Sequence, residues 1–255
     1  MFQALILGIV QGLTEFLPVS STAHLILFPW FFNWGGEVDT LTFDIALHAG
    51  TLFALILCFW KDWMVLIFKK QRLFGLIVLA SIPAGAAGFL LNDIAEYYLR
   101  KPLLISLMLI AGGIIMLVAE KVYKFRDMEN TGIKDAIFIG IAQAIAIIPG
   151  VSRSGITISA GLFRGFEREA AARFSFLLST PLIAGATVLH FKKAFMGQGN
   201  HDLQLFSIGL ISSFITGFIA IKFLLSFLKK YPMNLFVYYR FVLAAVIIIG
   251  IWLKG

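Results

Sequence analysis

Residues 149–157 combine the residue types that bind phosphate. The sequence reads Pro-Gly-Val-Ser-Arg-Ser-Gly-Ile-Thr and lies between two strongly apolar segments. An arginine in this setting is expensive, because a charge at the centre of a bilayer costs at least about 2.5 kcal/mol. The Pro-Gly pair breaks one helix, and Ser152 or Ser154 can cap the next. A helix N-terminus, hydroxyls and the Arg153 guanidinium together predict an anion site. The alternative is a loop whose arginine only reaches the lipid headgroups.

A second polar group follows the first apolar segment. Gln11 and Glu15 are four residues apart, so they share a helix face. After a proline, the residues that open the next helix are Ser20, Ser21, Thr22 and His24. A hydroxyl and an imidazole at this spacing can point into one pocket. Glu15 lies on an apolar helix and therefore needs a partner for its charge. The candidates are a metal ion, Arg153 and a proton. The alternatives are an ion-coupling Glu15, a structural His24 and serines that only satisfy the broken backbone.

The composition is that of a polytopic α-helical membrane protein. The chain has 255 residues, of which 60% are hydrophobic and only 14% charged, with a mean hydropathy of +0.91. The net charge of +7 indicates cytoplasmic loops and anionic headgroups, and no nucleic acid partner is expected. A single cysteine, Cys58, excludes an internal disulfide and a cysteine-cluster metal site. We expect the first helix to belong to the mature protein, because it lacks a basic leader region.

The hydrophobic segments divide into spans and broken pairs. Six segments are long enough to cross about 30 Å of hydrocarbon, namely 43–60, 73–91, 103–119, 174–191, 205–228 and 236–253. The other four form two pairs, 2–17 with 23–32 and 133–148 with 156–163. Non-helical tips at membrane depth are tolerated only inside protein or beside water. The pairs therefore predict two re-entrant hairpins, over 2–33 and 133–163. The expected fold is an all-α polytopic membrane protein.

The two pairs also resemble each other at a constant offset. Residues 8–11 (Gly-Ile-Val-Gln) match residues 140–143 (Gly-Ile-Ala-Gln), and residues 19–21 match residues 151–153. One membrane domain, 1–255, then contains two repeats, 1–120 and 133–255. Each repeat has one hairpin and three spans, and because three is odd the second copy is inverted. Inverted repeats bring their broken helices together near the midplane. Chance similarity is the alternative.

The loop charges indicate an orientation for this topology. Thirteen of the 21 basic residues lie in loops on the side opposite the termini, and five lie on the side of the termini. The positive-inside rule makes the more basic side cytoplasmic. We therefore expect a multi-pass protein of the plasma (inner) membrane with both termini outside.

Two stretches, 11–24 and 149–157, resemble the signature motifs of the bacitracin-resistance type undecaprenyl-diphosphatases. Residues 173–178 and 239–241 also resemble that family, so the likeness covers essentially the whole chain. The resemblance implies a membrane hydrolase that removes the terminal phosphate of undecaprenyl diphosphate. This reaction recycles the lipid carrier of peptidoglycan synthesis and confers bacitracin resistance. The resemblance also implies a divalent cation, Mg²⁺ or Ca²⁺, and a site that opens to the outer side of the membrane.

The resemblance and the chemistry of these side chains together suggest roles for individual residues. The expected catalytic residues are Glu15, Ser21, His24 and Arg153, and Glu15 is also the candidate metal ligand. The expected substrate-binding residues are Gln11, Ser20, Thr22, Ser152, Ser154, Thr157 and Arg240. Many family members have a glutamate where this chain has Gln11. An acidic residue at this position is therefore not expected to be indispensable. The loop over 61–72 is shorter than in familiar members. Ser21 is the expected nucleophile with Glu15 or His24 as base, and His24 as the nucleophile is the rival.

Other readings of the same residues stay open at this point. Paired broken helices are also a transporter architecture, so the site is also compatible with a flippase of a polyprenyl phosphate or a carrier of a small anion. Phosphate release from a prenyl diphosphate separates the enzyme from either transporter. The expected partners are the polyprenyl diphosphate and membrane lipids, with a homodimer left open. Asp44 and His48, one turn apart, either line the site or cap their helix.

Overall fold

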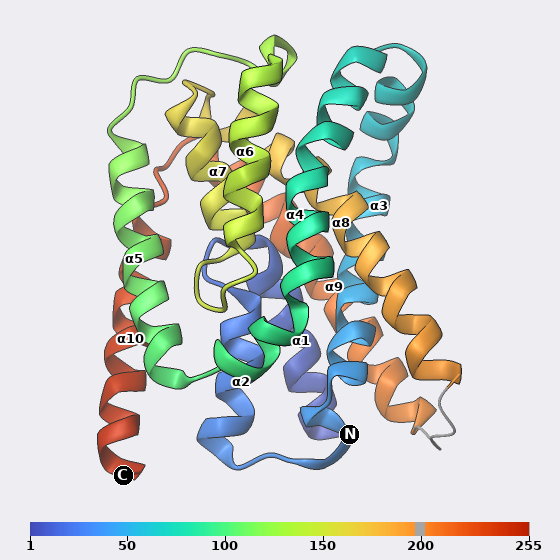
Figure 1. The fold of residues 1–255 in the computed structure, drawn as a ribbon, viewed down its shortest axis with the longest axis vertical. Coiled ribbons are helices and arrows are strands. Elements are labelled where there is room, and N and C mark those ends of the chain that lie inside the picture. Colours follow the sequence, from blue (N-terminus) through green and yellow to red (C-terminus); the bar gives the residue numbers. More distant parts are fainter. Residues whose placement is uncertain (197–201, 255) are drawn as a thin grey trace.

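A computed structural model describes residues 1–196 and 202–254, without the side chains of residues 92, 93, 95–97 and 190–196. Within these ranges the chain forms α-helices joined by short loops and two 3-10 turns, which confirms the all-α class (Figure 1). The helices are α1 (Phe2–Phe16), α2 (Ser21–Phe32), α3 (Leu41–Phe68), α4 (Gln71–Tyr98), α5 (Pro102–Glu120), α6 (Ile133–Ile145), α7 (Arg153–Phe163), α8 (Arg168–Met196), α9 (Leu203–Leu228) and α10 (Asn234–Lys254). The two 3-10 turns are η1 (Gly36–Asp39) and η2 (Met128–Asn130).

Six helices of the described chain are long and apolar enough to cross a membrane, as the sequence predicts. They are α3, α4, α5, α8, α9 and α10. The helices α1, α2, α6 and α7 have only 15, 12, 13 and 11 residues. At 1.5 Å per residue these four are about 16–22 Å long, which is less than the hydrocarbon thickness. None of the four can cross the bilayer alone, so each pair has to turn back inside the protein.

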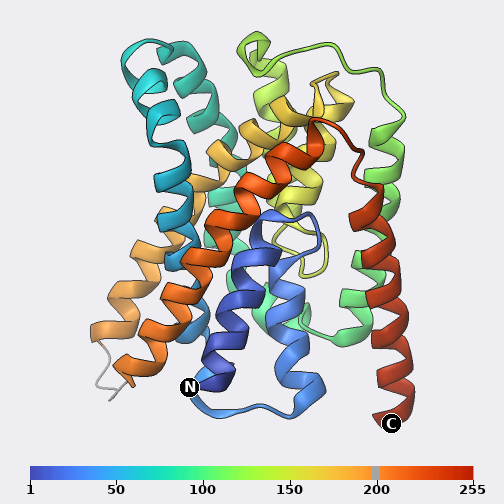
Figure 2. The same cartoon turned by 180° about the vertical axis from the view of Figure 1, so that it is seen from behind.

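The two short pairs enter the bundle from opposite ends. The α1–α2 hairpin starts at the end that holds both termini, and the α6–α7 hairpin starts at the other end (Figure 1). Their connecting loops meet near the middle of the molecule, which the view from behind also shows (Figure 2). In the first hairpin α1 packs against α9, and in the second α6 packs against α4. These are corresponding pairs under the proposed duplication, whose inverted symmetry stays a prediction.

Small residues bring the short helices close to their neighbours. A Cβ on Gly12 of α1 would lie 2.6 Å from the Gly217 amide of α9, and a Cβ on Gly8 would lie 2.6 Å from the Gly209 carbonyl. A Cβ on Gly140 of α6 would likewise lie 2.5 Å from the Ala80 carbonyl of α4. Close backbone approach at small residues is a main source of helix association in membranes. The glycines therefore fix both hairpins against the long helices.

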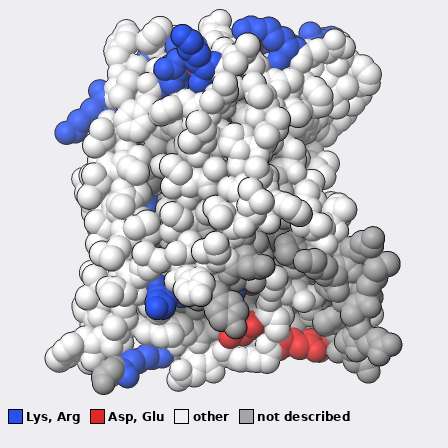
Figure 3. Space-filling model, viewed as in Figure 1, with Lys and Arg blue, Asp and Glu red and all other residues white. Residues whose placement is uncertain are grey.

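The basic side chains gather at the end of the bundle opposite the termini. In Figure 3 Lys and Arg are concentrated at the end where α3 meets α4 and α6 begins. There the buried carboxylate of Asp135 accepts hydrogen bonds from Arg126, at 2.7 Å, and from Arg164, at 2.5 Å. Arg168 pairs in the same way with Glu120 at 2.8 Å. The Asp135–Arg164 pair ties the start of α6 to the end of α7, so it holds the second hairpin at its base, and the Arg168–Glu120 pair joins the start of α8 to the end of α5.

Candidate active site

Both hairpin loops turn through the same unusual backbone conformation. Ser20 and Ser152 have φ values of 78° and 72°, in the left-handed region that few non-glycine residues adopt. Each serine is the N-cap of the second helix of its hairpin, at positions that the sequence offset of the repeats equates. The first N–H groups of α2 and α7 therefore lie at the loop tips, where an anion can accept hydrogen bonds from them.

The two loops are bonded directly to each other. The Gly150 N–H donates to Ser20 Oγ at 3.2 Å, and Ser154 Oγ donates to the Leu17 carbonyl at 3.2 Å. Residues from the two halves of the chain thus form one polar centre inside the bundle. The sequence predicts this convergence from the paired broken helices.

Arg240 of α10 holds the loop tips from behind. Its side chain is fully buried and donates to backbone carbonyls of both loops and of α5. The five acceptors are the carbonyls of Pro18, Gly150, Val151, Met108 and Leu109. The guanidinium passes α5 at Gly112, where any Cβ would collide with it. Arg240 is absent from the lining of the cavity described below, so the structure places this expected substrate-binding residue behind the loops instead.

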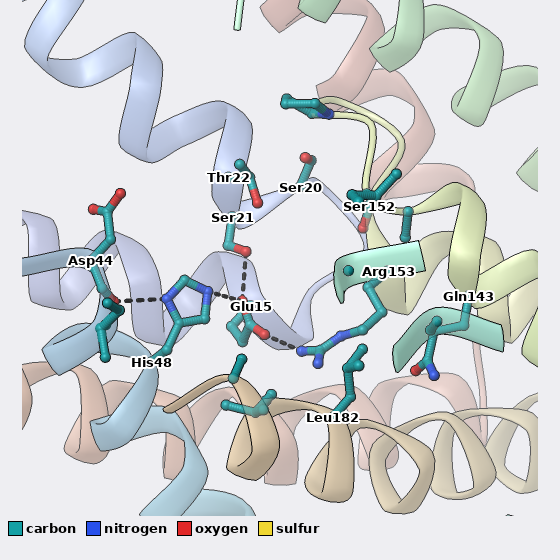
Figure 4. A pocket seen from close by; sticks show the side chains of 18 of the residues that line it. Glu15, Ser20, Ser21, Thr22, Asp44, His48, Gln143, Ser152, Arg153 and Leu182 are labelled. Carbon is teal, nitrogen blue, oxygen red and sulfur yellow. Dashed lines mark hydrogen bonds and ion pairs between the residues drawn. The ribbon is translucent and has the colours of Figure 1, made fainter. Parts of the chain in front are cut away.

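Glu15 is the centre of the polar cluster on the other side of the loops. Its carboxylate forms an ion pair with Arg153 and accepts a hydrogen bond from Ser21 Oγ at 2.5 Å (Figure 4). Gln11 Nε2 also donates to the carboxylate, at 3.1 Å. The Glu15 side chain is only 4% exposed, so its charge depends on these partners. Of the three partners that the sequence leaves open for Glu15, the structure shows Arg153.

His48 of α3 completes this cluster. Its Nε2 lies 3.7 Å from Glu15 Oε2, and its Nδ1 hydrogen bonds to the Asp44 carbonyl at 2.7 Å. Because a carbonyl only accepts, Nδ1 carries a proton, and Nε2 faces the Glu15 carboxylate. The sequence leaves the role of His48 open between lining the site and capping a helix, and the structure places it in the site.

These residues line a cavity of about 340 Å³ that runs from the loop tips toward the end with the termini. Its polar wall contains Glu15, Ser20, Ser21, Thr22, His48, Gln143, Ser152 and Arg153. Its apolar wall comes from α4 and α8 and contains Ala84, Gly88, Leu182, Ile183 and Ala186. Arg100 and Asp44 line the cavity farther from the tips. A charged group and an apolar chain can therefore be held in one continuous space.

The remaining expected site residues lie behind this cavity. His24 is buried and hydrogen bonds to the Ser20 carbonyl at 2.8 Å and to the Tyr239 hydroxyl at 2.7 Å. Thr157 hydrogen bonds to Ser175 Oγ at 2.6 Å. Ser154, as noted above, bonds the opposite loop. The structure therefore gives all three residues contacts that support the loops and does not bring His24 to Ser21.

Two cavity residues carry little local signal in the sequence. His48 lies 24 residues after His24, the last residue of the nearest motif, and Gln143 precedes Arg153 by ten residues. Only the repeat offset, which equates Gln143 with Gln11, points to the second of them. The position of His48 depends on how α3 packs against the hairpin, and local sequence does not encode that packing.

The side-chain oxygens of this site can hold a divalent cation only if the substrate supplies further ligands. Among the described residues, no group of three or more His, Cys, Asp or Glu side chains is close enough to hold a metal ion. Glu15 offers one carboxylate at the cavity, whereas the Gln11 amide oxygen has no hydrogen-bond partner among the described residues but is fully buried and absent from the cavity lining. Magnesium commonly binds through one or two carboxylates together with substrate phosphates and water. The residues present match that arrangement.

The fold and the site define a class of protein. This is a polytopic helical membrane protein in which two broken hairpins present a Ser–Glu–Arg cluster, centred on a buried glutamate, to a cavity with one apolar wall. Comparison with known proteins identifies the family. Residues 4–246 match the family described as bacitracin resistance protein BacA. The chain belongs to this family, which confirms the resemblance seen in its motifs.

Named relatives match over nearly the full length. A protein of Thermodesulfovibrio yellowstonii named undecaprenyl-diphosphatase is 58% identical over 97% of this chain and 96% of the relative. Proteins with the same name from Moorella thermoacetica and Pelotomaculum thermopropionicum are 47% and 48% identical. The first of these matches 99% of this chain and 98% of the relative, and the second 97% and 96%.

Proposed function

We propose that this chain is an undecaprenyl-diphosphatase, which hydrolyses undecaprenyl diphosphate to undecaprenyl phosphate and inorganic phosphate. One observation carries the proposal: a serine hydroxyl, Ser21 Oγ, donates to a buried carboxylate, Glu15, that an arginine also contacts. A hydroxyl beside a base is the arrangement that activates a nucleophile. A flippase of a lipid phosphate needs only binding groups, so this pair exceeds what transport requires. The names of the relatives support the same activity.

The substrate lies with its diphosphate at the loop tips and its prenyl chain along the apolar wall. Arg153, together with the N-terminal N–H groups of α2 and α7, stabilises negative charge on the phosphates. Ser20, Thr22 and Ser152 add hydroxyl donors at the same cavity wall. The helices α4 and α8 contribute Ala84, Leu182 and Ile183, which contact the hydrocarbon chain instead of water.

The reaction proceeds in two displacements. Ser21 Oγ attacks the terminal phosphorus and passes its proton to Glu15, while the bond from that phosphorus to the bridging oxygen breaks. Undecaprenyl phosphate leaves with the bridging oxygen and takes this proton from Glu15, so Ser21 is phosphorylated and Glu15 is a carboxylate again. Water then attacks the phosphoserine while Glu15 takes its proton and passes it to Ser21 Oγ. The bond between Oγ and phosphorus breaks, which releases inorganic phosphate and restores the serine. Arg153 compensates charge on the transferred group in both displacements.

A divalent cation, Mg²⁺ or Ca²⁺, would be held by Glu15 together with phosphate oxygens of the substrate. It would supply positive charge that neutralises the diphosphate. Gln11 orients the Glu15 carboxylate through the hydrogen bond from its Nε2, so this carboxylate stays close to the Ser21 hydroxyl.

The cavity opens to the outer side of the plasma membrane in this proposal. Lys and Arg gather at the end where α6 begins (Figure 3), and the positive-inside rule assigns such an end to the cytoplasm. Leu41, Asp44 and Arg100 line the cavity toward the opposite end. That opening suits a substrate released outside during peptidoglycan assembly, and the same activity accounts for resistance to bacitracin.

Phosphate release by the purified protein in detergent tests the proposal, with a prenyl diphosphate as substrate and with or without EDTA. We expect release from the unaltered protein, suppressed by EDTA and abolished in Arg153→Ala. Because removing Arg153 alone leaves Glu15 buried and unpaired, the double variant Arg153→Ala with Glu15→Gln controls for stability. Arg173→Ala is the matched control, since Arg173 pairs with Asp62 and Glu169 at the basic end. No release by well-folded protein, or near-normal release by Arg153→Ala, would contradict the proposal.

A further inference from the structure

Gln143 is a buried amide at the cavity wall that the reaction scheme above leaves unused. It lies on the last turn of α6, and its side chain is 2% exposed. Over the described ranges, neither Nε2 nor Oε1 of this side chain has a hydrogen-bond partner. A buried polar group without a partner costs about 1–3 kcal/mol, so such groups usually have a ligand or a bound water. Gln143 also lines the cavity, where a ligand can reach it.

The repeat explains why this amide has no partner. Gln143 corresponds to Gln11, whose Nε2 donates to Glu15 four residues later. At the position that corresponds to Glu15 the second hairpin has Ile147. The first hairpin therefore uses its amide to orient a carboxylate, and the second keeps the amide without the carboxylate. The tight packing of α6 on α4 at Gly140, one turn earlier, fixes the direction of the Gln143 side chain.

The position of Gln143 relative to the reacting groups suggests what it binds. In Figure 4 His48 lies on one side of Glu15, Arg153 and Gln143 lie on the other, and the Ser21 hydroxyl lies against the carboxylate between them. A terminal phosphate attacked by Ser21 occupies the Ser21 side. The second phosphate of the substrate, which stays on the lipid, then reaches the Arg153 side. Leu182, part of the apolar wall, is also on that side.

We propose that Gln143 binds the lipid-linked phosphate, with Nε2 donating to a non-bridging oxygen of the phosphate that leaves with the prenyl chain. The proposal rests on the diphosphatase function above and deepens it. Gln143 thus becomes a substrate-binding residue that holds the product as well as the substrate. A neutral amide is suited to this role, because it binds the phosphate without adding a second charge beside Arg153.

Product inhibition tests this assignment directly. Gln143→Met keeps the length of the side chain and removes both polar atoms. We expect its inhibition constant for geranylgeranyl monophosphate to rise about tenfold, from the loss of one hydrogen bond to a charged group. Its inhibition constant for inorganic phosphate, which occupies the Ser21 side, is expected to change less than twofold. Unchanged constants for both ligands, or a change for inorganic phosphate alone, would overturn the proposal.

Thermal stability separates binding from a structural role. Replacing an unpaired buried amide by an apolar side chain is neutral or stabilising, so Gln143→Met is expected to melt at the same temperature or higher. The matched control is Ser159→Ala, since Ser159 Oγ is likewise buried with no partner among the described residues, yet lies outside the cavity. The control is expected to keep both stability and inhibition constants. A lower melting temperature that parallels the loss of binding would make Gln143 structural and contradict the proposal.

A second variant covers the case in which Gln143→Met does not fold. Gln143→Glu has nearly the same shape but places a carboxylate beside the phosphate, so a loss larger than tenfold for the monophosphate is expected. Equal affinity of Gln143→Glu and the unaltered protein would overturn the assignment. Turnover of the unaltered protein is measured in the same series. Its absence would refute the proposed function, whereas normal turnover with unaffected Gln143 variants would refute only this inference.

Discussion

Arg240→Lys tests whether α10 supports the site from behind or contacts the substrate. Arg240 donates five hydrogen bonds to backbone carbonyls, whereas a lysine ammonium has three donors. At least two buried carbonyls therefore lose their partner. At about 1–3 kcal/mol for each, the substitution is expected to lower the free energy of unfolding by about 2–6 kcal/mol.

The assay is thermal unfolding of the purified protein in detergent without substrate, followed by kinetics on a prenyl diphosphate. We expect a melting temperature lower by on the order of 10 °C, and a lower kcat because the loop tips lose their support. Lys222→Met is the matched control. Lys222 is exposed on α9 with its ammonium 4.1 Å from the Phe218 ring, a contact worth about 0.5–1 kcal/mol. An unchanged melting temperature with a strongly raised KM would show that Arg240 contacts the diphosphate and would refute this reasoning.

Two further substitutions test the packing and the electrostatics. Gly12→Ala is expected to separate α1 from α9 and to lower the melting temperature, because the added Cβ would lie 2.6 Å from the Gly217 amide. Gly75→Ala is the control, since a Cβ at Gly75 would meet open space. Equal melting temperatures for the two variants would contradict the packing argument. His48→Gln is expected to lower kcat about tenfold, which is a smaller loss than in Glu15→Gln. His48 Nε2 lies 3.7 Å from the Glu15 carboxylate, so the imidazole assists Glu15 but does not bond to Ser21. An equal loss in both variants, measured by phosphate release, would make His48 the base.

The sequence predicts the elements of the fold better than their ends. The six spans follow from hydrophobic length, yet the segment expected over 43–60 is the helix Leu41–Phe68. The helix continues because Lys61 and Asp62 end the apolar run without breaking the backbone. Charged side chains leave the hydrocarbon but are compatible with helix. The hydrophobic pattern therefore reports membrane thickness, while helix length depends on where the backbone turns.

The candidate site could be predicted where its contacts are local or follow from the repeat. Gln11 and Glu15 share a helix face, and the matching loops bring Ser21 and Arg153 together. His24 is three residues from Ser21, but its side chain leaves the helix on the α10 face and bonds Tyr239. Spacing of three residues therefore does not establish a shared pocket when the helix is surrounded by protein. The sites of His48 and His24 are decided by packing between distant helices.

The phosphorylated residue is the most direct test of the central claim, that Ser21 activated by Glu15 carries out the displacement. The purified protein is mixed with a prenyl diphosphate that is labelled in its terminal phosphate, and the reaction is quenched within one turnover. The labelled peptide of the protein is then sequenced. We expect label on Ser21, and no label and no turnover in Ser21→Ala. Label on His24, or turnover retained in Ser21→Ala, would contradict it.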